Sequence, residues 1–319
     1  MRRIVIPDDA PPVMALSAAY RALIEREAVD YHATLPGSEE RLIERIAGAA
    51  VVINIRSSTR FTDAIFRRSP SLRLLSLWGT GTDNVDLAAA ARHEVTVTNT
   101  PGVSAFSIAE HALALMLAAA RRIPRVDAEI RQGHWPRGQA VQMHGKTLGI
   151  VGLGAVGSQF ARLGAGIGMR VIAWTMHPNQ ALGFELVSLD ELLRASDVVS
   201  LHLRLSSETR GFIGQREIEK MRPSAVLINT ARGAIVDEQA LLDALTTNRI
   251  AGAGLDVFEA EPLPDGHPLT RLDNVVLTPH SAGVTPEALE AGLKLSIDNV
   301  WNFLDGRPTN VVVSGNGAR

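Results

Sequence analysis

The stretch LGIVGLGAVGSQFARLGAGIG at residues 148–168 decides the fold. An apolar strand runs into glycines spaced G-x-G-x-x-G, and a helical pattern follows directly. In this context the first glycine permits a tight turn, the second lets a pyrophosphate approach the backbone, and the third allows close helix–strand packing. The start of the helix offers N–H groups to phosphates. With the next strand, RVIAW at 170–174, the pattern predicts a dinucleotide-binding βαβ unit whose contacts include Gly152, Gly154, Ala155, Val156 and Gly157.

Apolar runs alternate with helical patterns on both sides of this motif. Before it, the candidate strands are 3–6, 51–55, 74–77 and 95–98, with helical segments such as 38–47 and 63–68 between them. After Thr147 a second series begins, LGIVGL, RVIAW, VVSLHL, AVLINT, AGAGLDV and NVVLTPH. This alternation indicates parallel strands joined by helices. The sequence therefore predicts two α/β units, each a doubly wound parallel sheet.

Two helical segments mark the crossings between these units. Residues 104–121 are apolar on nearly every face, which is typical of a helix buried between layers or domains. Thr285 and Pro286 open a second helix, which Gly306 ends. We therefore expect a first domain made of residues 1–99 plus 285–319, which would bind the substrate, and an inserted dinucleotide-binding domain at 100–284.

Composition narrows the function classes. The chain has 319 residues, 21% of them charged, and a formal net charge of -2, which gives no basic face for nucleic acid. Cysteine is absent, which excludes disulfides, thiolate metal sites and a cysteine nucleophile. The apolar run after MRR is too short for a signal-peptide core, and the longest apolar stretch, 112–120, is too short to span a bilayer. We expect a cytoplasmic protein without a metal.

Three residues far apart in the chain supply the chemistry of a carbonyl reduction. They are Arg232 in NTARG, Glu261 in DVFEAEP and His280 in TPHSAG, each at a strand-to-loop junction. A guanidinium offers paired donors to a planar 2-oxo carboxylate. An imidazole titrates near neutrality, and a neighbouring carboxylate favours its protonated, donating form. Beside a bound nicotinamide, which carries the hydride, this set predicts reduction of 2-oxo acids or oxidation of 2-hydroxy acids.

The choice between NAD and NADP stays open. The acidic residue that accepts from the adenosine ribose in NAD-binding folds is expected at the end of the second strand, about 20 residues after the glycines. Here that strand ends at Thr175, followed by Met176 and His177. A neutral residue does not repel a 2'-phosphate, and Arg204 after VVSLHL is either an adenosine contact or a surface charge. We expect NAD, with NADP also admitted.

At this point the chain resembles the D-isomer-specific 2-hydroxyacid dehydrogenase family, which includes phosphoglycerate dehydrogenases and glyoxylate or hydroxypyruvate reductases. Six motifs carry the resemblance in order: WGTGTDNVDL at 78–87, NTPGVSAFSIAEHALALML at 99–117, GKTLGIVGLGAVGSQFARL at 145–163, LINTARGAIVDEQALLDAL at 227–245, GAGLDVFEAEPLP at 252–264 and NVVLTPHSAG at 274–283. The resemblance implies a flavodoxin-like and an NAD-binding Rossmann-like domain with the active site in the cleft between them.

Matched position by position, the resemblance makes Arg232 the substrate anchor, His280 the acid/base and Glu261, rather than Glu259, its partner. It also implies cofactor contacts at Thr230, Ala231, Asp256 and Gly283. On the substrate side it implies a carboxylate cradle of backbone N–H groups, an arginine as in phosphoglycerate dehydrogenases, and two positions that depart from the family pattern. These residues are Gly79, Thr80 and Gly81 for the cradle, Arg56 for the arginine, and Trp78 and Ser104 for the departures.

Two further readings accompany this one. Some relatives are nucleotide-sensing corepressors, so a binding protein with little turnover is the alternative to an enzyme. Formate dehydrogenase relatives pair the histidine with glutamine, and Glu261 argues against that variant. The resemblance also implies a homodimer formed through the nucleotide-binding domain, partly by the helix at 104–121 and the loop with Trp135. The particular 2-oxo or 2-hydroxy acid and the physiological direction are not determined by the sequence.

Overall fold

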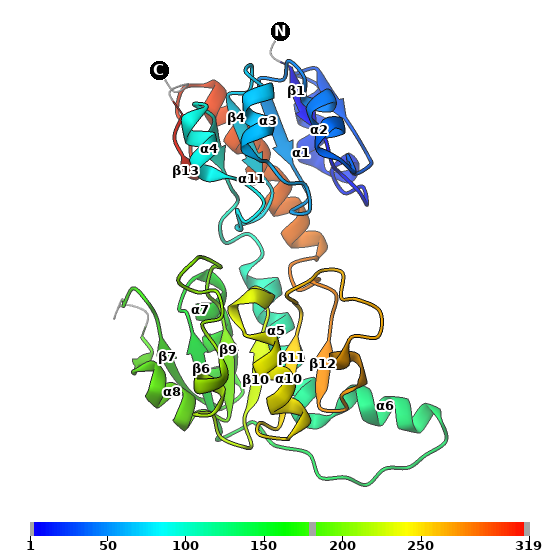
Figure 1. Cartoon of the computed structure of the whole chain (residues 1–319), viewed down its shortest axis with the longest axis vertical. Helices are drawn as coiled ribbons and strands as arrows, with labels where there is room; N and C mark the ends of the chain where they lie inside the picture. The colour runs from blue at the N-terminus through cyan, green and yellow to red at the C-terminus, as the bar shows by residue number, and fades with distance from the viewer. Residues whose placement is uncertain (1–2, 179–182, 316–319) are drawn as a thin grey trace. The chain divides into compact units, whose positions relative to one another are not determined.

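A computed structural model of the chain describes residues 3–178 and 183–315. It divides into two compact units, shown in Figure 1: the first unit comprises Met1–Ser104 with Thr285–Arg319, and the second unit comprises Ala105–Val284. Residues 1–2 and 316–319, assigned to the first domain from the sequence, lie outside the described residues, as do residues 179–182 of the predicted nucleotide-binding domain.

The first unit is built on a six-stranded sheet with the order β13-β5-β4-β3-β1-β2. Strands β1 to β5 are parallel and follow the flavodoxin-like order, and β13 pairs with β5 antiparallel at one edge. The strands are β1 (Ile4–Ile6), β2 (Val29–Tyr31), β3 (Val51–Asn54), β4 (Leu74–Leu77), β5 (Thr96–Thr98) and β13 (Val311–Val313).

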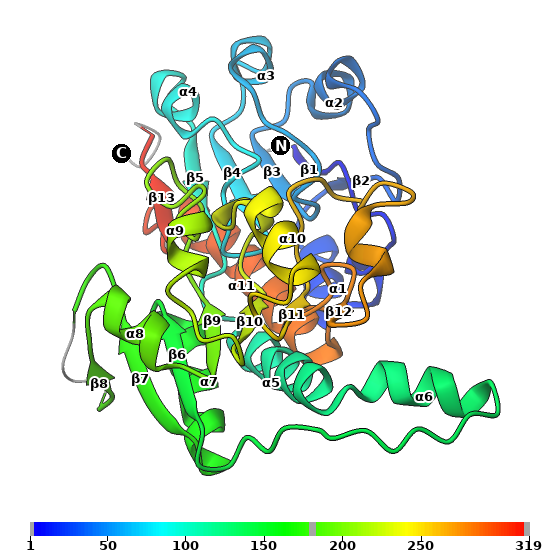
Figure 2. The ribbon, with the colours of Figure 1, turned by 60° about the horizontal axis from the view of Figure 1, so that its bottom comes forward.

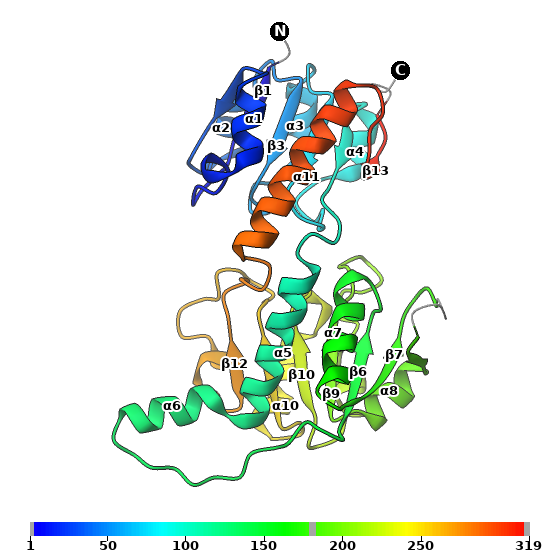
Figure 3. The same cartoon turned by 180° about the vertical axis from the view of Figure 1, so that it is seen from behind.

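Helices cover both faces of this sheet because alternate strand residues point to opposite sides. On one face α2 (Glu39–Ile46), α3 (Asp63–Arg68) and α4 (Leu87–Arg92) pack on residues such as Val5 and Val52. On the other, seen from behind in Figure 3, α1 (Ala18–Ile24) and α11 (Pro286–Leu304) pack on residues such as Ile4 and Ile53. A 3-10 helix, η1 (Met14–Leu16), precedes α1.

The second unit is built on a seven-stranded parallel sheet with the order β12-β11-β10-β9-β6-β7-β8. The strand order reverses beside β6, which is the switch point where open α/β sheets bind ligands at the carboxyl ends of their strands. The strands are β6 (Thr147–Val151), β7 (Arg170–Trp174), β8 (Glu185–Leu186), β9 (Val198–Leu201), β10 (Val226–Asn229), β11 (Gly252–Leu255) and β12 (Val275–Leu277).

Two apolar layers enclose this sheet. Helices α5 (Ala105–Arg121) and α7 (Ala155–Gly166) form the layer in front in Figure 3, and α8 (Leu189–Ala195), α9 (Gln215–Ile218) and α10 (Glu238–Thr246) form the opposite layer. Short 3-10 helices follow β10 and precede β12, η3 (Gly233–Ile235) and η4 (Pro268–Arg271). Helix α6 (Ile123–Arg131) projects from the sheet of this unit in Figure 2, and none of its residues is buried.

The predicted fold class, two parallel-sheet α/β domains, is confirmed. Strands 74–77 and 170–174 have the bounds expected from the sequence, and α11 begins at Pro286, with the Thr285 hydroxyl accepting from the Ala288 N–H at 3.2 Å. The sequence reading did not identify β2, β8 or β13, which have two or three residues each and little burial. In the described part of the chain, no helix combines the length and apolarity needed to cross a membrane.

Candidate active site

The glycine motif forms the turn from β6 into α7. Gly152 has φ +103°, a conformation that residues with a side chain rarely adopt, and a Cβ there would lie 2.6 Å from the His202 carbonyl oxygen. A Cβ on Gly157 would lie 2.0 Å from the Gly152 oxygen, so this glycine lets α7 approach the turn. A Cβ on Gly154 would have no atom of the described chain within 4 Å.

This open side of Gly154 fits a ligand. Gly154 precedes α7 and has no side chain to cap it, so the first helical N–H groups, beginning with Ala155 and Val156, are presented where phosphates bind at helix N-termini. The residues present therefore fit the pyrophosphate of a dinucleotide, with one glycine for the turn, one for ligand access and one for packing.

The adenosine end of the predicted site is neutral. Thr175 follows β7 and its hydroxyl accepts from the His177 N–H at 3.4 Å. Arg204, in the loop after β9, is exposed, and its carbonyl accepts from Thr209 at 2.6 Å. His202 is the first residue of this loop, and its ring pairs with the Ser200 hydroxyl at 2.9 Å. Burial lowers the pKa of His202 to about 3, so its ring is neutral at working pH.

The segment after β10 carries Arg232. The Asn229 side chain closes this turn, accepting from the Ala231 N–H at 3.0 Å and donating to the Arg232 carbonyl at 2.9 Å. Arg232 donates from Nη1 to the Ala231 carbonyl at 2.8 Å, which holds its guanidinium back along the turn. The Thr230 hydroxyl is buried without a hydrogen-bond partner among the described residues, an arrangement that a bound ligand can complete.

Glu261 and His280 form a hydrogen-bonded pair. The distance from His280 Nδ1 to Glu261 Oε2 is 2.6 Å, and the other carboxylate oxygen accepts from the Phe258 N–H at 3.0 Å. Burial raises the pKa of Glu261, but the hydrogen bonds from His280 and Phe258 and the charges of His280 and Arg232 outweigh it, so the net pKa lies below its ordinary value. The carboxylate is therefore ionised beside the ring.

This pairing also sets the orientation of the imidazole. Because Nδ1 faces the carboxylate, Nε2 is the ring nitrogen that can face a substrate. The His280 backbone has φ +53°, in the left-handed region, which costs a residue with a side chain on the order of 1–3 kcal/mol unless the surroundings fix it.

Asp256 supplies those surroundings. It follows β11, is 1% exposed, and its carboxylate accepts from the N–H groups of Ser281 and Ala282, both at 2.9 Å. Its carbonyl accepts from the His280 N–H at 2.8 Å. The Val284 N–H then donates to the Ser281 carbonyl, closing the turn that contains Gly283. Asp256 therefore fixes the backbone on both sides of the His280 side chain.

A cavity of about 530 Å³ opens beside the pair. All of its lining residues belong to the second unit, and apart from Glu261, His280 and Thr278 they are apolar, namely Phe258, Pro262, Leu263, Leu277 and Pro279. An apolar wall reduces the solvent screening of the pair on that side, while the side chains of His280 and Glu261 stay 39% and 35% exposed.

In the first unit, the predicted cradle forms a turn after β4. Gly79 has φ +120°, and its N–H already donates to the Thr100 hydroxyl at 2.7 Å. The Thr80 carbonyl accepts from the Asn99 side chain at 2.7 Å. The Gly79 amide is thus engaged within the chain, which leaves Thr80 and Gly81 as the positions whose N–H groups can serve an anion.

The remaining substrate-side residues have different surroundings. Trp78 packs on the cluster that includes α11, where a Cβ on Gly292 would lie 2.2 Å from the indole Nε1. Arg56 is 19% exposed; its Nη2 donates to the Pro11 carbonyl and lies 3.6 Å from the fully buried Asp9. Ser104 is partly buried immediately before α5. Trp78 and Arg56 are therefore held by their own unit.

Sequence reasoning missed two residues beside Asp256. His111, on α5, places Nε2 2.9 Å from the Thr278 hydroxyl oxygen, and Thr278 lies 2.6 Å from Asp256. The separation of 167 residues between His111 and Thr278 leaves no local signal for this contact. Among the described residues, no group of three or more His, Cys, Asp or Glu side chains is arranged to hold a metal ion.

Known proteins share the sequence pattern and the fold of this chain. Residues 113–282 match the family model described as D-isomer specific 2-hydroxyacid dehydrogenase, NAD binding domain. The chain is 43% identical over 272 residues to a glyoxylate reductase of Aeropyrum pernix, covering 80% of this chain and 81% of that protein. It is 38% identical over 306 residues to a D-3-phosphoglycerate dehydrogenase of Archaeoglobus fulgidus, covering 91% of this chain but only 58% of that protein.

A solved structure extends the likeness over the whole chain. An acyclic imino acid reductase in complex with NADPH and D-Arg has a TM-score of 0.90 and 31% identity, covering 98% of this chain and 100% of that one.

The chain belongs to the D-isomer specific 2-hydroxyacid dehydrogenase family. It is an NAD(P)-dependent oxidoreductase of the class that acts on the CH–OH group of 2-hydroxy acids, and these relatives do not favour the corepressor-like alternative.

Proposed function

We propose that the chain reduces small, unphosphorylated 2-oxo acids such as glyoxylate to 2-hydroxy acids. The observation that carries this proposal is the contact of 2.6 Å between His280 Nδ1 and Glu261, with Arg232 contributing to the field at that carboxylate. Relatives named glyoxylate reductase support the substrate class. The physiological direction we propose is reduction.

The side chains have distinct roles in this proposal. Arg232 binds the carboxylate and carbonyl oxygen of the 2-oxo acid through paired N–H donors. His280 donates the proton at Nε2 to that carbonyl oxygen as the bond to hydrogen forms at C2, and Glu261 stabilises the charged ring before the transfer. Bound NADH or NADPH supplies the hydride. In the reverse direction the same Nε2 takes the hydroxyl proton.

Cofactor binding is assigned to the second unit. We place the pyrophosphate on the 152–157 turn, the adenosine near Thr175 and Arg204, and the nicotinamide near Thr230, Ala231, Asp256 and Gly283. The neutral Thr175 supports acceptance of both cofactors, because it does not repel a 2'-phosphate. Comparable kcat/KM values with NADH and NADPH, within about tenfold, are expected from such a site.

Substrate contacts in the first unit are assigned to the 79–81 turn, with Trp78 and Ser104 as neighbours. Arg56 would recognise a substrate phosphate only after leaving Asp9 and the Pro11 carbonyl. Breaking this ion pair is costly because the fully buried Asp9 carboxylate, although it keeps hydrogen bonds from the Val13 and Met14 N–H groups, would lose the positive charge beside it. This observation favours substrates without a phosphate.

A rate assay tests the proposal directly. Oxidation of NADH and of NADPH is followed in parallel with glyoxylate, hydroxypyruvate, pyruvate, phenylpyruvate, 2-oxoisocaproate and 3-phosphohydroxypyruvate. We expect turnover of at least one unphosphorylated acid and much lower kcat/KM for the phosphorylated one. Saturable cofactor binding with no turnover of any acid would contradict the proposal and favour a nucleotide-sensing binding protein.

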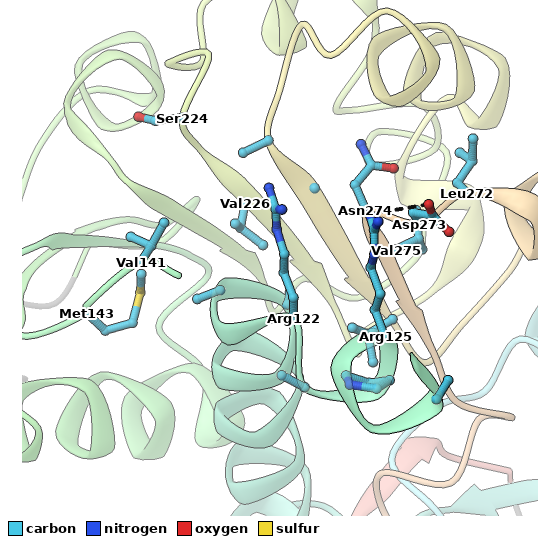
Figure 4. Close-up of a pocket in the computed structure, with 18 of the residues that line it drawn as sticks. Arg122, Arg125, Val141, Met143, Ser224, Val226, Leu272, Asp273, Asn274 and Val275 are labelled. Carbon is cyan, nitrogen blue, oxygen red and sulfur yellow. Dashed lines mark ion pairs between the residues drawn. The ribbon is translucent and has the colours of Figure 1, made fainter. Parts of the chain in front are cut away.

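The same proposal includes a homodimer formed through the second unit. Helix α6 has no buried residue, and its apolar side chains Ile123 and Ile130 are 54% and 46% exposed. Trp135, which follows the helix, is 75% exposed. Beside the start of α6 lies a cavity of about 450 Å³, shown in Figure 4, in which Arg125 pairs with Asp273 at 3.3 Å. Exposed apolar side chains gathered on one helix and the loop after it are typical of an interaction site.

Sedimentation velocity tests the dimer. Wild-type protein should sediment as a dimer, and the double variant Ile130→Ser/Trp135→Ser should sediment as a monomer. Met176, which is also exposed in the second unit at 40%, provides the matched control Met176→Ser. Equal sedimentation of all three proteins would refute this interface. We further propose a cytoplasmic enzyme without a nucleic-acid partner, which cell fractionation and gel-shift assays test.

A further inference from the structure

The loop that carries His280 is fastened by a polar chain that starts on a different element. Asp256 accepts hydrogen bonds at both carboxylate oxygens, from Ser281 at Oδ1 and Ala282 at Oδ2. A third donor, the Thr278 hydroxyl, lies 2.6 Å from Oδ1. These three donors come from residues on both sides of His280, so the position of the Asp256 carboxylate and the path of this loop are coupled.

The hydrogen positions along this chain follow from the inventory of donors. A carboxylate that accepts backbone N–H groups at both oxygens acts as an acceptor, so the Thr278 hydroxyl donates its single hydrogen to Asp256. Thr278 Oγ1 can then only accept from its other neighbour, His111 Nε2, at 2.9 Å. His111 must therefore carry a hydrogen on Nε2, and the chain runs His111 to Thr278 to Asp256.

His111 joins this hydrogen-bond network from α5, which packs on one face of the second sheet while α10 packs on the other. Its Nε2 also lies 3.5 Å from Asp256 Oδ1, and its side chain is 23% exposed. A histidine that served only to fill the core would not need two oxygen atoms at this range. The imidazole instead links α5 to Asp256 and Thr278, which directly follow β11 and β12.

We propose that His111 is a positioning residue for the proton transfer, which holds Thr278 and Asp256 so that the His280 loop keeps its left-handed backbone. This inference rests on the proposed function, because it assumes that His280 transfers the proton. His111 touches neither substrate nor cofactor in this scheme. Its loss therefore changes the chemical step rather than the binding of either reactant.

Four single variants, each made in the whole 319-residue protein, test the proposal in the rate assay. His111→Ala removes the donor, His111→Gln returns an N–H donor at similar reach, and Thr278→Val removes the hydroxyl at nearly constant shape. His267→Ala is the matched control, because His267 is another largely buried, hydrogen-bonded histidine of the second unit whose ring pairs with Glu238 at 3.1 Å. The melting temperature and the Kd for NADH are measured for each protein.

A small misplacement of the acid/base can slow a reaction on the order of 100-fold. We expect kcat of His111→Ala and of Thr278→Val to fall about 10- to 100-fold, with KM values and the Kd for NADH within about threefold of wild type. His111→Gln should recover most of the lost kcat. The double variant His111→Ala/Thr278→Val should lose no more than the worse single variant, because both substitutions break one chain.

Three results would overturn the inference. They are wild-type kcat in His111→Ala, equal losses in His111→Ala and His267→Ala, or a His111→Gln protein as slow as His111→Ala despite a wild-type melting temperature. If His111→Ala does not fold, His111→Gln and Thr278→Val still decide between the two readings. His280→Asn, run beside them, separates the failures: wild-type turnover in that variant would refute the proposed function itself.

Discussion

Replacing Glu261 by glutamine should slow turnover while leaving cofactor binding intact. The two carboxylate oxygens have different donors, His280 Nδ1 at 2.6 Å and the Phe258 N–H at 3.0 Å. Glutamine has one acceptor oxygen, so its NH₂ group must face one of these donors, and the negative charge beside the imidazole is lost. The ring would then carry its proton without a counter-charge.

The size of the effect follows from this contact. A hydrogen bond to a charged group contributes about 1.5–3 kcal/mol. The side chains of His280 and Glu261 are 39% and 35% exposed, so solvent screens their interaction and the lower part of that range applies. A loss of about 1.5–2 kcal/mol in the transition state corresponds to roughly 10- to 30-fold in kcat.

Initial rates with the best 2-oxo acid of the panel measure this change, and the Kd for NADH is measured by fluorescence. Glu259→Gln is the control, because it removes an exposed carboxylate two positions away with the same change of net charge. The reasoning is refuted if Glu261→Gln keeps kcat within about twofold of Glu259→Gln.

Three further expectations concern other parts of the molecule. Gly157→Ala places a methyl group 2.0 Å from the Gly152 carbonyl oxygen, so it should cost about 1–3 kcal/mol of stability and weaken NADH binding. Gly166→Ala, with open space around it, should do neither. Thermal melts and NADH titrations compare the two variants. Arg232→Ala should lower kcat/KM for the 2-oxo acid roughly 100-fold through lost charged hydrogen bonds, and steady-state rates at saturating cofactor show whether this happens. His202 has a folded-state pKa of about 3, below its ordinary 6.5, so the unfolded chain takes up the proton first. The free energy of unfolding should therefore fall by up to about 1.4 kcal/mol per pH unit as pH decreases below 6.5. Urea unfolding at several pH values should show that this free energy depends less steeply on pH in His202→Gln than in the wild type. Equal pH dependence in the two proteins would contradict the assignment.

The sequence predicts the parts of this fold whose patterns are long or strongly apolar. RVIAW is predicted correctly as β7 at Arg170–Trp174 because it is a short, mostly apolar run that directly follows a helical pattern. The edge strands β8 and β13 leave no such signal, since one has two residues and the other exposes two of its three. Helix α6 is not among the predicted elements, although Ile123, Val126 and Ile130 recur at helical spacing, and none of its residues is buried.

The site shows the same division between local and distant information. The need for glycine at 152 and 157 follows from a local motif, and a Cβ at either position would meet backbone atoms. The partner of the Gly79 amide, Thr100, lies 21 residues away and is brought close by the pairing of β4 with β5. Contacts of this kind depend on the packed structure and cannot be read from spacing.

The order of the segments along the chain also bears on synthesis. All seven described strands of the second sheet lie in the continuous segment Ala105–Val284, whereas the first unit also needs α11 and β13 from the end of the chain. During synthesis, the face of the first sheet that contains Ile4 and Ile53 is fully covered only after α11 has left the ribosome. Although domains nearest the N-terminus generally fold first during synthesis, we expect the second unit to become protease-resistant earlier, which arrested nascent chains of increasing length would show.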